Sequence, residues 1–184
     1  MKIFYLSAIL LMTFASCKCK KELENQSQKI EEPKITNSEK MSKQPCPENG
    51  VCKVEMFKNT SLDIKTDEFG SIYYNKIESL DKSVILYTYN RNVEKGLQDG
   101  NYREEIVFEI DNTTKELTLK NQDLQQTKML FGRFCYCKGS TGNYIVTDGK
   151  LHLTQNKNQI QFDLQFNNNK VPQIINNISE SVKQ

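Results

Sequence analysis

The segment Gln159–Phe166 (QIQFDLQF) places an apolar residue at every second position, and this alternation constrains the fold more than any other feature of the chain. Ile160, Phe162, Leu164 and Phe166 are apolar, and the residues between them are polar. Successive side chains of a β-strand point to opposite faces, so this pattern predicts a strand with one buried and one solvated face. Such a strand needs neighbouring strands for its backbone and a second apolar layer over its buried face.

Further segments rich in β-branched and aromatic residues recur along the chain at short spacing, with turn residues between them. We expect strands at 51–57, 62–65, 72–77, 83–89, 104–110, 116–119, 128–137, 144–147 and 151–154. Little of this region has helical periodicity. The pattern therefore predicts a mainly β fold, an antiparallel β-sandwich or a small β-barrel.

Two local patterns refine this prediction. The sequence Asp148-Gly149 lies between two of the expected strands, and Asp-Gly is a strong signal for a tight β-hairpin. Near the C-terminus, Ile174, Ile175, Ile178 and Val182 recur at helical spacing after a proline. We therefore expect a short C-terminal helix.

The first 16 residues predict a signal peptide. Lys2 precedes an apolar run of thirteen residues, 3–15, which is shorter than the roughly 20 residues that a membrane-spanning helix needs. The run ends in Ala15-Ser16-Cys17, two small residues before a cysteine, which resembles the lipobox of bacterial lipoproteins. The resemblance implies cleavage between Ser16 and Cys17 and a diacylglyceryl group on the Cys17 sulfur, with acyl chains such as palmitate. Cys19 is a rival site, but Lys18 would then occupy a position that requires a small residue.

Residues 17–45 form the next segment, and we expect the acylated cysteine and a disordered polar tether there. The segment is rich in Lys, Glu, Gln, Asn and Ser and has no aromatic residue, so it cannot bury enough apolar surface to fold. Residues 46–184 are then a single β-rich domain. Together these segments predict a lipid-anchored protein of the cell envelope, at the outer membrane.

Charge limits the classes of partner. The chain has a formal net charge of +2 and no long basic stripe, so nucleic acid is not an expected partner. The expected partners are the membrane, through the lipid anchor, and an envelope protein or glycan.

Four cysteines remain in the domain: Cys46, Cys52, Cys135 and Cys137. An even number of cysteines in an exported domain predicts disulfides. Residues i and i+2 of an extended strand lie roughly 6.6 Å apart, at the limit for a disulfide. We therefore expect two long-range bonds, each joining Cys46 or Cys52 to Cys135 or Cys137. A four-thiolate zinc site and a redox-active dithiol are the alternatives.

Catalytic signatures are weak. His152 is the only histidine, and its neighbours Leu151 and Leu153 are expected to point inward, so His152 should be a surface residue. The motifs CPENGVC and GRFCYCKGSTGNY resemble those of small lipoproteins with no assigned activity, and that resemblance implies no active site. We expect a non-enzymatic binding or structural module without a cofactor. An envelope thiol-redox or zinc protein is the alternative, and a hydrolase based on carboxylates is a third hypothesis.

Overall fold

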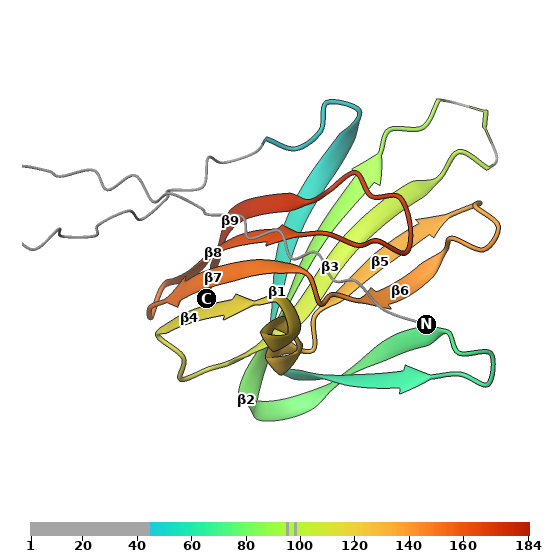
Figure 1. Ribbon diagram of the computed structural model, residues 1–184. Helices are drawn as coiled ribbons and strands as arrows, with labels where there is room; N and C mark the ends of the chain where they lie inside the picture. Colours follow the sequence, from blue (N-terminus) through green and yellow to red (C-terminus); the bar gives the residue numbers. More distant parts are fainter. Residues whose placement is uncertain (1–44, 95, 98) are drawn as a thin grey trace, which may run out of the picture. The chain divides into compact units, whose positions relative to one another are not determined.

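The computed structural model describes residues 45–94, 96, 97 and 99–184. Within these residues the chain forms two antiparallel sheets, one of five strands and one of four (Figure 1). The first sheet has the order β1-β2-β3-β5-β6 and the second the order β4-β7-β8-β9. The elements are β1 (Gly50–Thr66), β2 (Ile72–Arg91), β3 (Tyr102–Asp111), β4 (Glu116–Lys120), the 3₁₀ helix η1 (Asn121–Thr127), β5 (Leu130–Cys135), β6 (Gly142–Ile145), β7 (Gly149–Gln155), β8 (Gln159–Phe166) and β9 (Asn177–Lys183).

The mainly β fold is confirmed, and it combines features of a sandwich and of a barrel. A single pairing of Ile72 with Asn143 returns strand β6 to the far half of β2. This pairing closes β2, β3, β5 and β6 into a ring, while the four-stranded sheet forms a separate layer.

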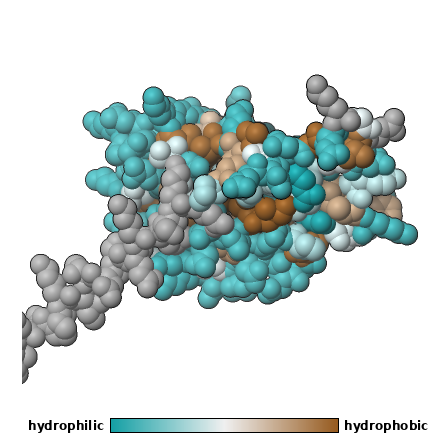
Figure 2. All heavy atoms as spheres, turned by 90° about the horizontal axis from the view of Figure 1, so that it is seen from above, coloured by the Kyte–Doolittle hydropathy of each residue, from teal (hydrophilic) through white to brown (hydrophobic). Residues whose placement is uncertain are grey.

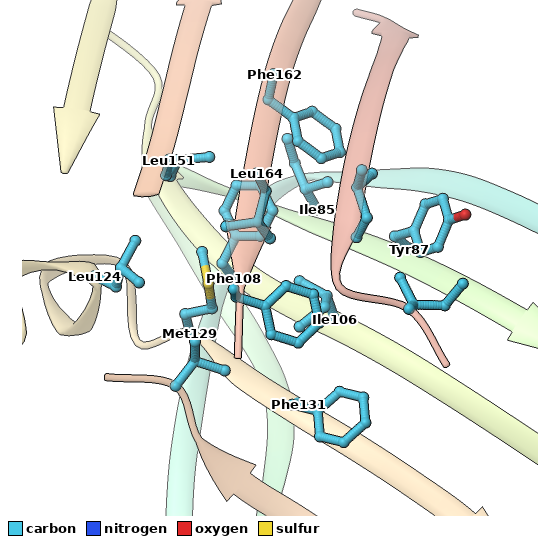
Figure 3. Packing of buried hydrophobic residues seen from close by; sticks show 14 of the residues in the cluster. Ile85, Tyr87, Ile106, Phe108, Leu124, Met129, Phe131, Leu151, Phe162 and Leu164 are labelled. Carbon is cyan, nitrogen blue, oxygen red and sulfur yellow. The ribbon is translucent and has the colours of Figure 1, made fainter. Parts of the chain in front are cut away.

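The main core lies between the inner faces of the two sheets. Alternate residues of β2, β3 and β5 meet alternate residues of β7 and β8, as Figure 3 shows for Ile85, Phe108, Leu151 and Phe162. The rings of Phe108 and Phe162 meet edge to face, with centroids 5.4 Å apart. The alternation that predicted strand β8 therefore faces the core as expected, because its four apolar side chains are all buried.

A second, smaller core lies on the opposite face of the first sheet. Strands β1 and β2 are long, and each joins two of the expected strands into one. Their distal ends fold back over that face, with a register shift between Lys58 and Thr60, so that Leu62 covers Val84 and Val107. The hairpin thereby buries part of this face of the first sheet as well.

The carboxylate of Glu109 fixes the folded-back hairpin. It accepts hydrogen bonds of 2.8 Å from both Ser61 Oγ and the backbone N–H of Leu62, and it pairs with Lys128 Nζ at 3.1 Å. Burial acts to raise the pKa of Glu109, but these hydrogen bonds and the Lys128 charge outweigh it and hold the pKa below its ordinary value.

The predicted C-terminal helix is wrong, because residues 177–183 form strand β9 along the edge of β8. Ile178 and Val182 alternate with polar neighbours and add to the core on one face. The spacing of the isoleucines fits both periods over so short a segment. Pairing with the otherwise unpaired edge of β8 satisfies backbone groups that a helix would leave exposed on that edge.

The predicted hairpin at Asp148-Gly149 is also wrong. Strand β6 belongs to the first sheet and β7 to the second, so the chain crosses between the layers here. Gly149 is required for a different reason: a Cβ at this position would collide with the carbonyl oxygen of Gln165 and would lie 2.8 Å from Phe166 Cα. The glycine therefore permits the close approach of β7 to β8.

Candidate functional site

The four domain cysteines form two local disulfides, Cys46–Cys52 and Cys135–Cys137. The prediction of long-range bonds is therefore wrong. Strands β1 and β5 are separated by β2 and β3, so Cys52 and Cys135 lie about three strand spacings, or roughly 14 Å, apart. The Cα atoms of Cys135 and Cys137 are only 5.1 Å apart because β5 ends at Cys135 and the chain bends at Tyr136.

Both disulfides lie toward one end of the first sheet. Cys52 pairs with Tyr89, Tyr89 with Glu104, and Glu104 with Arg133, while Cys135 pairs with Tyr102 in the next row. An open groove with a volume of about 630 Å³ runs across the ends of β2, β3 and β5 at this edge. Its lining consists of polar, cationic and aromatic side chains with the disulfide at one side: Asn90, Arg91, Asp99, Asn101, Tyr102, Arg103, Phe134, Cys135, Tyr136 and Thr141.

The arginines give this groove its distinct chemistry. The chain has three arginines among 25 basic residues; Arg91 and Arg103 line the groove, and Arg133 is buried beside the ring of Tyr102. The guanidinium carbons of Arg91 and Arg133 lie 4.1 and 5.3 Å from the ring centroid of Tyr102, and that of Arg103 lies 4.4 Å from the ring centroid of Phe134. Sequence reasoning missed this cluster, although the restriction of arginine to three sites was a visible signal.

A buried carboxylate, Glu104, lies behind the groove and holds Tyr102, which lines it. Glu104 is only 1% exposed and accepts hydrogen bonds from Tyr102 Oη and from the backbone N–H groups of Ile174 (2.7 Å) and Ile175 (2.8 Å). Burial and the hydrogen bond to Glu104 raise the pKa of Tyr102, so the phenol stays protonated. Glu104 thereby ties the segment before β9 to β3 and fixes the ring on which Arg91 stacks.

Arg133 orders the turn on the other side of the groove. Its Nε donates to Tyr102 Oη at 3.3 Å and its Nη1 to the carbonyl of Ser140 at 2.8 Å, while Thr141 Oγ1 donates to the Arg133 carbonyl at 3.2 Å. These bonds hold the chain that returns from Cys137 to β6. Gly139 and Gly142 in this segment have positive φ angles, which glycine adopts without a steric penalty. Tyr136 projects from this region with 84% of its surface exposed.

A second carboxylate, that of Glu105, lies beside the groove on the outer face of the first sheet, the face that points away from the second sheet. Glu105 contacts Arg103 Nε at 3.4 Å and accepts a hydrogen bond of 3.1 Å from Tyr74 Oη. Burial raises its pKa, and Arg103, Tyr74 and Lys76 offset only part of that rise. Gly132 makes room for this arrangement, because a Cβ there would lie 2.7 Å from Glu105 Cγ and 2.9 Å from Asn143 Oδ1.

The other sequence-predicted positions lie elsewhere. His152 is on the polar face of β7 between buried Leu151 and Leu153, and its Nδ1 is 3.0 Å from Thr118 Oγ1. Within residues 45–184, apart from 95 and 98, no three His, Cys, Asp or Glu side chains are placed to hold a metal ion. Ser16, Cys17, Cys19 and most of the tether lie outside the described residues.

Comparisons of the sequence with protein-family models and curated proteins, and of the structure with solved structures, find no match. In the part of the chain that the structure describes, no helix has the length and apolar character to cross a membrane.

Proposed function

We propose that this protein is a lipid-anchored module of the bacterial cell envelope that binds a ligand through the groove at the ends of β2, β3 and β5 and catalyses no reaction. The observation that carries this proposal is the placement of Arg91 and Arg103 in the groove, each stacked on an aromatic ring of the lining, Tyr102 or Phe134. Such side chains recognise ligands by charge, stacking and hydrogen bonding. The lipobox resemblance and the polar segment 17–45 support attachment to a membrane at a distance from the domain.

The surface supports a polar ligand rather than a large apolar partner. Figure 2 shows hydrophilic residues over most of the face seen from above, with hydrophobic residues in smaller patches. The most exposed large apolar side chains lie on different elements, such as Phe69 in the β1–β2 turn, Leu80 in β2 and Tyr136 after β5. Because these three side chains come from three different elements, no single element presents them together as one apolar surface.

In vivo photocrosslinking tests the proposed binding site. A benzophenone amino acid replaces Tyr136 at the groove or, as the control, exposed Lys157 in the β7–β8 turn of the full-length protein. We expect a discrete adduct with an envelope component from position 136 and none from position 157. Equal crosslinking at both positions would show that the groove has no special role.

The anchor is tested separately. Cys17→Ala should abolish incorporation of radiolabelled palmitate and leave the uncleaved precursor, whereas Cys19→Ala should leave both labelling and processing intact. Labelling that persists in Cys17→Ala would refute the lipid-anchor half of the proposal.

A thiol–disulfide exchange function is the second candidate, and the position of Cys135 in the groove wall favours it. A substrate dithiol would reduce the Cys135–Cys137 bond to two thiols and would itself become a disulfide, so two electrons and two protons pass to the protein. Oxidation of a reduced dithiol peptide by the full-length protein, compared with the Cys135→Ser/Cys137→Ser variant, tests this function. Stoichiometric peptide oxidation by the wild type alone would support it, and equal rates would exclude it.

A further inference from the structure

We infer that the groove binds a carboxylated glycan, with Arg91 and Arg103 receiving the carboxylates and Tyr136 stacking on a sugar ring. This inference rests on the proposed binding function and specifies the ligand class.

Part of the positive charge in the groove has no carboxylate partner among the described residues. Among the described residues, Arg91 has no carboxylate within ion-pair distance, and Arg103 shares its charge only with Glu105 at 3.4 Å. Glu105 is 94% buried and lies on the outer face, so its carboxylate neutralises one guanidinium at most. Asp99 is the one carboxylate in the described lining of the groove. The described lining therefore sets two guanidinium groups against the single carboxylate of Asp99, and Arg91 is the group whose charge is open to an anion.

Aromatic rings preorganise the guanidinium groups of the groove. Each lies over an aromatic ring, Arg91 over Tyr102 and Arg103 over Phe134. Stacking occupies the flat face of a guanidinium and leaves its N–H edge available, which suits a bidentate contact with a planar carboxylate. Tyr102 is itself held by Glu104 and Arg133, so the position of Arg91 over the ring is set by buried hydrogen bonds.

The remaining side chains of the groove suit the neutral part of the ligand. Tyr136 offers a ring that is 84% exposed, and Asn90, Asn101 and Thr141 add hydrogen-bonding groups to the same groove. An aromatic face packs against the C–H face of a sugar ring, and amide and hydroxyl groups match sugar hydroxyls. The groove is open along the edge of the sheet, which fits a chain of sugar units better than a ligand that must be enclosed.

Other anionic ligands fit less well. A nucleic acid presents closely spaced phosphates and is bound by extended basic surfaces, whereas this groove combines two arginines with Asp99. An acidic polypeptide would satisfy the arginines but would leave the exposed ring of Tyr136 and the amides without a matching partner. We therefore commit to the carboxylated glycan and treat the acidic polypeptide as an outcome of the test.

Calorimetric titration of the full-length protein in detergent micelles tests the inference. The probes are an oligogalacturonate, its fully methyl-esterified form, and poly-glutamate of similar charge. We expect the oligogalacturonate to bind and the ester to bind at least about tenfold more weakly, because charge-assisted bonds to arginine are lost. Equal binding of acid and ester would overturn the inference, as would equally tight binding of poly-glutamate.

Matched variants locate the site. Arg91→Gln and Arg103→Gln should each weaken oligogalacturonate binding by about tenfold. Tyr136→Ala should weaken it severalfold without affecting folding, since this ring is mostly outside the core. Lys157→Gln removes the same charge from the exposed β7–β8 turn and should leave the affinity unchanged. A loss with Lys157→Gln equal to that with Arg91→Gln would show unspecific charge attraction and would overturn the inference.

The experiments distinguish a failure of the ligand class from a failure of the proposed binding function. Groove-specific crosslinking from position 136 without oligogalacturonate binding would overturn the ligand class and support the binding function. Absence of both would overturn both.

Discussion

Replacing Glu104 with Gln should destabilise the protein by about 3 kcal/mol. The carboxylate is 1% exposed and accepts hydrogen bonds from three donors: Tyr102 Oη and the N–H groups of Ile174 and Ile175. A glutamine keeps one acceptor oxygen and turns the other into a donor, so at least one buried N–H or O–H loses its partner and the remaining bonds lose their charge. Each hydrogen bond to a charged group contributes about 1.5–3 kcal/mol, and an unsatisfied buried donor costs about 1–3 kcal/mol. The total is therefore about 3 kcal/mol, against a typical domain stability of about 5–15 kcal/mol.

Urea unfolding of the full-length protein in detergent, followed by far-ultraviolet circular dichroism because the chain has no tryptophan, measures this change. With a slope of about 2 kcal/mol per molar urea, the midpoint should fall by about 1.5 M. Glu116→Gln is the control, since Glu116 is exposed on β4, and its midpoint should match the wild type. Amide hydrogen exchange should also quicken at Ile174 and Ile175. If Glu104→Gln unfolds at the same urea concentration as Glu116→Gln, the view that this carboxylate ties the C-terminal segment to β3 is refuted.

Three further predictions concern Glu109, Gly149 and the pairing of the cysteines. The folded-state pKa of Glu109 lies below its ordinary value of 4.5, so its carboxylate stabilises the fold above about pH 4.5. This stability is lost as the pH falls through the folded-state pKa. In urea titrations, the difference in stability between wild type and Glu109→Gln should therefore shrink over that pH range. Gly149→Ala should lower the stability by about 1–3 kcal/mol more than Gly70→Ala, because both glycines have positive φ but only Gly149 faces the backbone of β8; equal losses in thermal unfolding would contradict the close approach. Trypsin digestion without reductant should yield peptides 44–53 and 134–138, each two mass units light from an internal disulfide, and a peptide that joins these two ranges would refute the local pairing.

The sequence predicted the strands well because the local alternation of side chains reports directly on a half-buried sheet. Strand β8 has the expected burial at every apolar position, and β3, β4 and β7 match the expected segments closely. The predicted polar surface position of His152 also agrees with the structure. Local alternation carries no information about which strands pair with one another. The division of β6 and β7 between two sheets was therefore not predictable from the sequence Asp148-Gly149.

The errors arose where two local readings fit the same residues and a distant contact decided between them. The spacing of Ile174, Ile175 and Ile178 fits a helix as well as a strand. The strand forms because Glu104, about 70 residues earlier, accepts hydrogen bonds from the backbone of Ile174 and Ile175, and because the edge of β8 pairs with the segment that follows. The pairing of Cys135 depended on a bend at Tyr136 that ends the extended geometry assumed for the strand.

The groove was harder to predict because its residues come from three strand ends and a loop. Arg91 and Arg103 lie on either side of a polar loop in the sequence, and Arg133 lies in the cysteine motif. Only the register of β2, β3 and β5 brings them together. The available signal was that only three of the 25 basic residues are arginines, because arginine is suited to stacked and bidentate contacts.

Hydrogen-exchange mass spectrometry of the full-length protein, with and without oligogalacturonate, tests the central claim most directly, because it reports on the whole domain at once. If the groove is the binding site, exchange should slow in segments 90–103 and 134–141, with no change in the β1–β2 turn at 66–72 and no effect of the methyl-esterified probe. Slower exchange in the β1–β2 turn with the groove segments unchanged would contradict the account.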